Sequence, residues 1–333
     1  MEVGFVSAAQ FIEHQTGRFH PERPDRIRAI HRAVRMAGLI DSPDPFPEFE
    51  IDLGIKKQDA VKLKELAPKP AELQQILAVH PRSLIDLIQH RCAMGGGVLD
   101  QGDTPVSPES YEIALLSASS AIRACDAVMK SEVKRAFSAA RPPGHHAEPD
   151  RPMGFCLFSN IAIAARYAQQ VFNVEKIVIV DFDVHHGNGT QAVFEADSSV
   201  LFISLHQHPS TCYPGSGFEW EMGVGAGKGY TLNIPLDPGG GDDEYAAAFD
   251  GKVIPRMEQF KPQLLMISAG FDGHVDDPLA NMTLTDDGFE MMTRKLADVA
   301  NAHCGGRIVS VLEGGYNLRT LGRSVVRHLL AMA

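Results

Sequence analysis

The sequence has no excess of basic residues and no long apolar run. Asp and Glu number 42 against 31 Lys and Arg, which gives a formal net charge of −11 at pH 7. Direct binding of duplex nucleic acid needs clustered Lys and Arg, so we expect no nucleic-acid partner. No apolar run approaches the roughly 18 residues of a membrane-spanning helix, so we expect no membrane partner. The acidic charge favours a cationic partner, such as a lysine-bearing tail or a polyamine.

Cysteine is scarce and irregularly spaced. The five cysteines form no CxxC pair and no regular framework; they are Cys92, Cys125, Cys156, Cys212 and Cys304. This pattern predicts reduced thiols in a cytoplasmic protein rather than a disulfide scaffold. The start, "MEVGFVSAAQF", has neither a basic region nor a sustained apolar core, so we expect no secretory signal.

After residue 134 the chain alternates short β-rich runs with helical runs. The strand candidates are "RAFSA", "KIVIVDF", "VLFISLH", "YTLNIPL", "LLMISAG" and "RIVSVLEGG". The helical candidates are 22–38, 109–130, 159–172, 243–260 and 285–304. Strands alternating with crossover helices predict an α/β fold, with a parallel sheet covered by helices on both faces. The Pro- and acid-rich stretch 41–54 reads as a loop and not as a linker, so we expect a single domain over 1–333.

Polar and titratable groups follow five of the expected strands. They lie in "RPPGHH", "DFDVHHG", "SLHQH", "AGFDGH" and "EGGY". Ligands of parallel sheets bind at the carboxyl ends of the strands. We therefore expect these five segments to converge on one edge of the sheet and to form a buried site.

A metal site is the first chemical interpretation of these strand ends. Residues two apart share a face of a strand, so Asp181, Asp183 and His185 point one way if the strand continues that far. Asp272 can add a third ligand to Asp183 and His185, and such a set leaves positions open for water and substrate. A divalent cation also compensates the buried carboxylates. In the alternative interpretation the aspartates cap backbone groups and His185 is an ordinary core histidine.

The tandem histidines His145 and His146 and the tyrosine Tyr316 are the second group of candidates. Paired histidines can act as general base and general acid, and a phenol can stabilise an oxyanion beside a metal. Gly314 and Gly315 let the tyrosine loop approach closely. Taken alone, each motif reads as an ordinary loop or turn.

Together, these motifs resemble the zinc-dependent histone deacetylase family of the arginase/deacetylase superfamily. The resemblance covers almost the whole chain, through "HQTGRFHPERPDRI", "RPPGHHA", "MGFCLFSNIAIAA", "DFDVHHGNGTQ", "YPGSG", "SAGFDGHVDDPLANMTLT" and "LEGGYNL". It is closest to class II and bacterial histone deacetylase-like amidohydrolases, because Asn188 stands where class I members usually carry an aspartate. The family implies an eight-stranded parallel sheet flanked by helices on both faces.

The resemblance implies Zn²⁺ on Asp183, His185 and Asp272, where it would polarise an acetamide carbonyl and activate a water molecule. His146 would act as general base and then protonate the leaving amine. Tyr316 would donate a hydrogen bond to the tetrahedral oxyanion.

Further residues support these roles in the family. His145 would be the electrostatic partner of His146, with Asp181 orienting it, and Asn188 would orient His146 while leaving it less basic than an aspartate would. The resemblance also implies K⁺ near the zinc, on Asp181, Asp183, His185, Ser204 and Leu205. A second K⁺ site would involve Phe194, Asp197, Val200 and Tyr230.

The substrate channel follows from the same resemblance. Phe155 and Tyr213 match the two aromatic walls around the lysine stem, although Tyr213 replaces the usual Phe, and Gly154 would present a carbonyl to the stem. Asp103 matches a rim carboxylate that clamps the substrate backbone; the alternative is an aspartate that caps the following helix. Leu279 stands where polyamine-selective relatives can carry a glutamate, which favours acyl-lysine over a cationic polyamine.

The leading hypothesis is therefore a zinc-dependent amidohydrolase that removes acetyl or related acyl groups from lysine side chains of a peptide or protein. An acetylpolyamine amidohydrolase acting on an acetylated small amine is the second hypothesis. A catalytically silent acyl-lysine-binding scaffold is less favoured, because such a protein should have lost a ligand, a tandem histidine or the tyrosine. An arginase-like manganese hydrolase would need carboxylates where "DFDVHHG" has histidine. A homo-oligomer stays open, with the loop 14–27 as a candidate interface.

Overall fold

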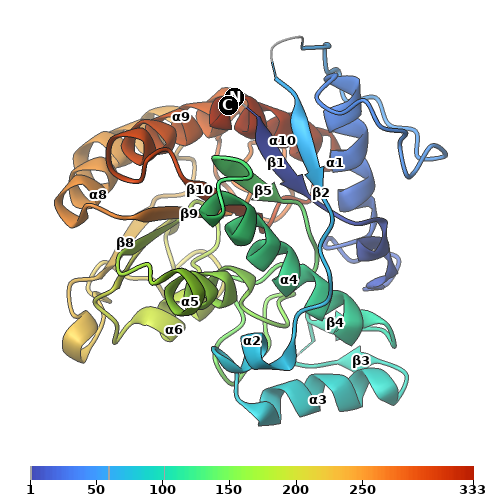
Figure 1. Ribbon diagram of the computed structural model, residues 1–333, viewed down its shortest axis with the longest axis horizontal. Coiled ribbons are helices and arrows are strands. Elements are labelled where there is room, and N and C mark those ends of the chain that lie inside the picture. Colours follow the sequence, from blue (N-terminus) through green and yellow to red (C-terminus); the bar gives the residue numbers. More distant parts are fainter. Residues whose placement is uncertain (1, 59–60, 101) are drawn as a thin grey trace.

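The computed structural model describes residues 2–58, 61–100 and 102–333, and its centre is one eight-stranded sheet (Figure 1). The strand order is β2-β1-β5-β10-β9-β6-β7-β8, and all neighbouring strands are parallel. The bounds are β1 Val3–Val6, β2 Leu63–Leu66, β5 Arg135–Ser138, β6 Ile177–Asp181, β7 Val200–Gln207, β8 Thr231–Leu236, β9 Leu264–Ala269 and β10 Ile308–Leu312. A separate antiparallel pair joins β3 Gly97–Val98 to β4 Pro105–Val106. The predicted parallel sheet is confirmed.

Helices cover both faces of the sheet (Figure 1). Their bounds are α1 Asp25–Met36, α2 Leu73–Leu77, α3 Arg82–Ala93, α4 Ser110–Met129, α5 Asn160–Phe172, α6 Asn188–Phe194, α7 Asp242–Ala248, α8 Ile254–Phe260, α9 Asp286–His303 and α10 Leu318–Met332. A π-helical segment, Phe249–Val253, joins α7 to α8, so the expected helix 243–260 is continuous and contains a π-helical turn. Among the described residues, no helix combines the length and apolarity needed to cross a membrane.

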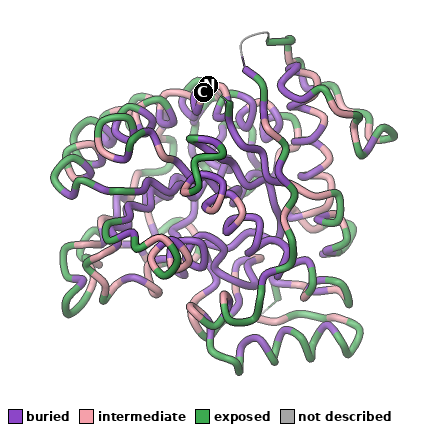
Figure 2. The backbone as a smooth tube through the Cα atoms, in the orientation of Figure 1, coloured by how far each residue is buried: buried purple, intermediate pink, exposed green. Residues whose placement is uncertain are grey.

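Strand β6 shows why the sheet is apolar on both sides. Val178 and Val180 pack into the core cluster that includes α1, α9 and α10 residues, whereas Ile177 and Ile179 pack into the cluster with α4 and α5. All four side chains are fully buried, and Figure 2 shows the central strands of the sheet in the colour of buried residues. Successive side chains of a strand point to opposite faces, so a strand between two helical layers must be apolar at every position.

The first two strands were missing from the sequence-based prediction. Strand β1 has only four residues, and β2, "LKEL", lies at the sheet edge with two charged residues among its four. Edge strands face solvent on part of their surface and therefore lack the continuous apolar run of the central strands. The helix α10 was also missed, although it packs against α1 and α9.

We expect the substitution Ile179→Ala to lower the free energy of unfolding by about 2–5 kcal/mol, because it removes buried methyl groups and leaves a cavity between the sheet and its helices. Val171→Ala on α5 is the matched control, since Val171 is 52% exposed, and it should change stability by less than about 0.5 kcal/mol. Urea unfolding followed by circular dichroism measures both. Equal stability losses in the two variants would contradict the assigned core.

Candidate active site

Two loops bring an Asp-His-Asp group together at the carboxyl edge of the sheet. Asp183 and His185 follow β6, and Asp272 follows the neighbouring strand β9. One ligand atom from each residue lies within 4.8 Å of the other two. His185 Nδ1 is 3.1 Å from Asp183 Oδ1 and 3.1 Å from Asp272 Oδ2. Two carboxylates and one imidazole, all buried, form a donor set that suits a divalent cation with open positions.

The group is not built by strand alternation, as the sequence had suggested. Strand β6 ends at Asp181, and the chain then turns. Asp181 Oδ1 accepts the N–H of Asp183, and Asp183 Oδ1 accepts the N–H of His185. The aspartates therefore do cap backbone groups, as the alternative interpretation required. They also form the cluster, because each carboxylate has two oxygens with several acceptor directions.

The same carboxylates tie other strand ends to the cluster. Asp183 Oδ2 accepts the N–H of Gly314, 2.7 Å away in the loop after β10. Asp272 Oδ1 accepts the N–H of Val184 at 3.1 Å. Both contacts are buried hydrogen bonds to a carboxylate, which are stronger than bonds between neutral groups. Three loops are thereby held in one arrangement before any ion binds.

His145 follows β5 and pairs with Asp181. Its Nδ1 lies 3.0 Å from Asp181 Oδ2. Burial opposes the charged imidazolium, but the carboxylates of Asp183 and Asp181 outweigh it and raise the pKa of His145 to about 10. Glu313 Oε2 fixes this loop by accepting the N–H groups of Gly144 and His145, at 2.7 and 3.1 Å. His145 is thus a buried cation in a fixed orientation.

His146 has the opposite electrostatic environment. Burial, followed by the charges of His145 and His185, holds its pKa well below the usual value. His146 Nδ1 lies 2.7 Å from Asn188 Oδ1, which can only accept a hydrogen bond. The Asn188 amide is itself oriented by donating to Glu148 Oε1 at 2.8 Å. This series of hydrogen bonds places the ring proton of His146 on Nδ1 and leaves Nε2 of the neutral imidazole free to accept a proton.

Tyr316 stands beside the cluster in the loop after β10. Its side chain is 8% exposed, and burial, followed by the charge of Asp272, raises the pKa of its phenol well above the usual value. The hydroxyl therefore stays protonated and can donate. The Arg26 guanidinium lies 5.0 Å from the centroid of the Tyr316 ring, and Arg26 Nε donates to Gly315 O at 2.7 Å.

A narrow cavity of about 230 Å³ leads to these groups. It is lined by Asp103, His146, Gly154, Phe155, His185, Tyr213, Leu279 and Tyr316. We call this cavity the slot. Its eight lining residues all belong to the set expected from the sequence, and six different loops contribute them. Phe155 and Tyr213 both lie on its wall, and the Phe155 N–H donates to Thr104 Oγ1 at 3.1 Å.

Gly154 is required at its position in the slot by space and by conformation. Its φ is +55°, which a side chain disfavours, and a Cβ built there would lie 2.5 Å from the His146 ring. Any larger residue would push the imidazole out of place. The proximity to His146 therefore accounts for the glycine before Phe155.

Asp103 lies at the mouth of the slot and does not cap a helix. The N-cap position of α4 is Glu109, so the alternative interpretation of Asp103 is wrong. The neighbouring Asp100, and not Asp103, binds the backbone of this loop: its Oδ1 accepts the N–H groups of Gly102, Asp103 and Thr104. Burial, followed by its contact with Asp100, raises the pKa of Asp103 to about 6. A wider cavity of about 560 Å³ shares Asp103 and Tyr213 with the slot.

The expected potassium ligands lie in two places. Ser204 and Leu205 on β7 adjoin Asp181, which pairs with Ser204 in the sheet register. The second set, Phe194, Asp197, Val200 and Tyr230, lies between the end of α6 and the starts of β7 and β8. There the Asp197 carboxylate already accepts from Arg166 Nη1 at 2.6 Å and from the Ser199 hydroxyl at 2.6 Å. Backbone carbonyls would have to supply most of that second site.

Three further buried residues, Glu22, Arg26 and Arg141, form an ion-pair cluster to which the sequence alone assigned no role. Glu22 Oε1 accepts from Arg26 Nη1 at 3.2 Å and from Arg141 Nε at 2.6 Å, and all three side chains are fully buried. Burial opposes the carboxylate charge, but Arg141 outweighs it and lowers the pKa of Glu22 to about 2. Arg141 begins "RPPGHH", and Arg26 contacts the tyrosine loop. The sequence signal for this cluster is the presence of charged residues in two motifs of the family resemblance, "HQTGRFHPERPDRI" and "RPPGHHA".

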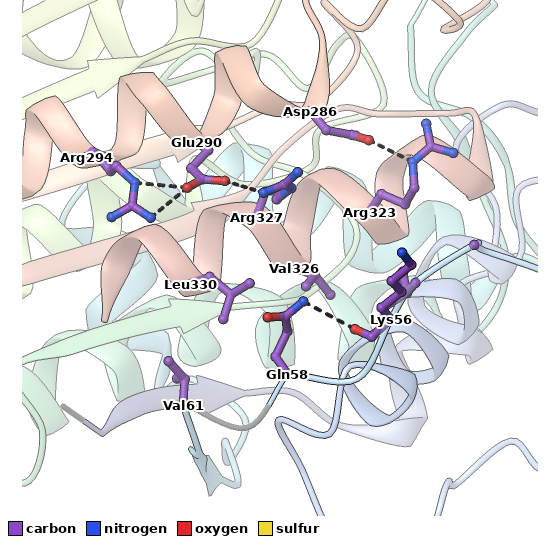
Figure 3. A pocket seen from close by; sticks show the side chains of 12 residues that line it. Lys56, Gln58, Val61, Asp286, Glu290, Arg294, Arg323, Val326, Arg327 and Leu330 are labelled. Carbon is purple, nitrogen blue, oxygen red and sulfur yellow. Dashed lines mark hydrogen bonds and ion pairs between the residues drawn. The ribbon is translucent and has the colours of Figure 1, made fainter.

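A cavity of about 500 Å³ between residues 54–58 and 61 on one side and helices α9 and α10 on the other lies apart from the slot residues (Figure 3). Its arginines are already paired, with Arg323 bound to Asp286 at 2.7 Å and Glu290 bound to both Arg294 and Arg327. Figure 3 shows these ion pairs running along the two helices. The pairs of Arg323 and Arg327 cross-link α10 to α9, whereas the Arg294 pair lies within α9. None of the catalytic candidates lies there.

Comparison with known proteins agrees with this geometry. Residues 20–332 match the histone deacetylase domain. A histone deacetylase-like amidohydrolase of Pseudomonas aeruginosa is 45% identical over 283 residues, covering 84% of this chain and 73% of its own. A probable deacetylase of Archaeoglobus fulgidus is 39% identical and covers 96% of this chain and 82% of its own. The crystal structure of the HDA15 HD domain superposes with a TM-score of 0.89 at 35% identity, over 99% of this chain and 89% of that one. The chain therefore belongs to the histone deacetylase family.

Proposed function

We propose that this protein is a zinc-dependent deacetylase that removes acetyl or related acyl groups from lysine side chains. The observation that carries the proposal is the slot, which is lined by His185 of the buried Asp-His-Asp group together with His146 and Tyr316. A narrow cavity suits an extended amine stem with a small acyl group at its tip. The relatives named as deacetylases and amidohydrolases support the same reaction class.

The metal would be held by Asp183, His185 and Asp272, and zinc bound there would polarise the amide carbonyl and acidify a water molecule. His146 would accept a proton at Nε2, because Asn188 holds the other ring nitrogen in its protonated form. Burial, followed by the charged ring of His145, lowers the pKa of His146 and makes it a weaker base in the free enzyme. This low basicity makes His146 a good acid once it holds the proton that the leaving amine needs.

Tyr316 would stabilise the oxygen of the amide as it gains negative charge. Its hydroxyl remains protonated, and Tyr316 lines the slot together with His146 and His185. A fixed donor of this kind acts without reorganising solvent. The aromatic rings of Phe155 and Tyr213 would exclude water from the substrate stem.

The choice between acyl-lysine and an acetylated polyamine as substrate depends on two residues that line the slot, Leu279 and Asp103. Leu279 is 37% exposed at the lip of the slot and offers no charge to a polyamine, so acyl-lysine is favoured. The Asp103 carboxylate at the same mouth keeps an acetylated polyamine as the second candidate, since it could attract a distal amine. We also propose that K⁺ binds beside Asp181 and Ser204. A single catalytic domain over residues 1–333 is part of the same proposal. Two plant relatives are named as chloroplastic, so the cytoplasmic location stays a prediction.

The substrate assignment is tested with zinc-replete enzyme and a panel of acetyl-lysine peptide, longer acyl-lysine peptides, acetylputrescine and acetylspermidine. We expect kcat/KM to be highest for an acyl-lysine peptide, because the lip residue Leu279 is apolar. Leu279→Glu should shift the preference towards acetylspermidine by electrostatic attraction. If the unmodified enzyme has a higher kcat/KM for acetylspermidine than for acyl-lysine peptides, the proposed acyl-lysine substrate is wrong and an acetylated polyamine takes its place.

Tyr316→Phe should lower kcat by roughly 10²-fold, because it removes one oxyanion donor, while the bound zinc stays stoichiometric. Tyr167→Phe is the matched control, since the Tyr167 hydroxyl bonds Asp126 outside the slot. Steady-state kinetics and elemental analysis measure the two quantities. An unchanged kcat in Tyr316→Phe would exclude the tyrosine as oxyanion donor.

Asp183→Asn should release the metal, because the amide is neutral and a poorer ligand than the carboxylate it replaces. Zinc content after dialysis should fall well below one per chain, and activity should fall with it. Asp126→Asn, at an aspartate outside the slot, should retain zinc and activity. Stoichiometric zinc in the Asp183→Asn protein would contradict the ligand assignment.

A further inference from the structure

One buried carboxylate links the two loops that carry Asp272 and Tyr316. Asp277 is 6% exposed and lies in the loop between β9 and α9. Its Oδ2 accepts the N–H of Tyr316 at 2.7 Å and the N–H of Asn317 at 3.1 Å. Its Oδ1 accepts the N–H of Leu279 at 3.2 Å. Three backbone donors from two separate loops therefore converge on one side chain.

The tyrosine loop needs such an anchor. It runs from β10 to α10 through Gly314 and Gly315, and glycine imposes little conformational restriction on the chain. Arg26 holds the loop at the Gly315 carbonyl. Asp277 holds it at the next residue, on the N–H of Tyr316 itself. The direction in which the phenol leaves the backbone is thereby fixed from two sides.

The contact with Leu279 extends the same anchor to the slot. Leu279 is only two residues from Asp277, and its side chain lines the slot together with Tyr316. One carboxylate thus sets the lip of the slot and the backbone of the oxyanion donor relative to each other. A displacement of either loop would stretch a hydrogen bond to the same group.

Asp277 has no other evident use. It is not a member of the Asp-His-Asp group, and it does not line the slot. A buried carboxylate is costly unless several hydrogen bonds compensate it, and here all three compensating donors belong to the two loops. Its neighbour Asp276, by contrast, has a side chain that is 62% exposed.

We propose that Asp277 is a positioning residue for Tyr316 and that it acts through the backbone of the tyrosine loop. The inference rests on the proposed role of Tyr316 as oxyanion donor. It concerns the placement of that hydroxyl and not the binding of the metal.

Asp277→Asn tests the inference directly, because the amide keeps the shape, removes the charge and retains only one acceptor oxygen. We expect kcat to fall at least about 10-fold, since a small misplacement of a catalytic group is sufficient for such a loss. KM should change less than about 3-fold, and zinc content should not change. Asp276→Asn is the matched control, one residue away and exposed, and it should retain the kcat of the unmodified enzyme. An unchanged kcat in Asp277→Asn would overturn the inference.

A double-mutant cycle separates positioning of Tyr316 from general destabilisation. If Asp277 acts through the phenol, Asp277→Asn should lower kcat by less than about 3-fold in the Tyr316→Phe background, because the hydroxyl it positions is gone. Multiplicative losses in the double variant would refute the inference while leaving the role of Tyr316 intact. If Tyr316→Phe alone has full activity, the proposed function of the tyrosine fails instead, and Asp277 has no catalytic group to position.

Asp277→Glu is the second variant, for the case that the asparagine variant does not fold. It retains the charge and moves the carboxylate by one methylene group. We expect a thermal unfolding midpoint close to that of the unmodified enzyme and a kcat lower by at least about 10-fold. Full activity in the glutamate variant would show that the position of this carboxylate does not matter, and it would reject the inference.

Discussion

Buried negative charge at the carboxyl edge of the sheet is the constraint on which the rest of the site depends. Asp181, Asp183 and Asp272 are almost completely buried. Such charges are tolerated only when cations and hydrogen bonds compensate them. His145 compensates part of this charge, backbone N–H groups from the loops after β6 and β10 compensate another part, and a divalent cation would complete the compensation. Compensation of the buried carboxylates therefore both fixes the loops at this edge of the sheet and favours the binding of a metal ion.

The two tandem histidines illustrate how that charge is distributed. They are adjacent in sequence, and their ring centroids are 4.0 Å apart, yet their pKa values move in opposite directions. The carboxylates favour the cationic form of His145, whereas burial, followed by the charge of His145, favours the neutral form of His146. Adjacent identical residues thus acquire different roles from their partners, an aspartate for one and an amide for the other.

Much of the architecture could be predicted because strong local patterns coincide with the buried elements. The central strands have continuous apolar runs, and the polar residues stand at their carboxyl ends, so the sheet and the family are confirmed. The roles assigned to individual site residues stay predictions. Both Asp277 and Glu22 lie in motifs of the family resemblance, but their contacts could not be predicted, since their partners are distant in the chain. Nothing local distinguishes the buried Asp277 from the exposed Asp276 beside it.

The carboxylate of Glu22 binds one arginine that precedes the histidine loop and another that contacts the tyrosine loop. It is contributed by a segment that precedes the first long helix and adds only Glu22 to this assembly of charges. A proteolytic cut just after this segment would leave two guanidinium groups enclosed without their counter-ion. Removal of this segment would therefore disturb both loops, although every residue that lines the slot would still be in the chain.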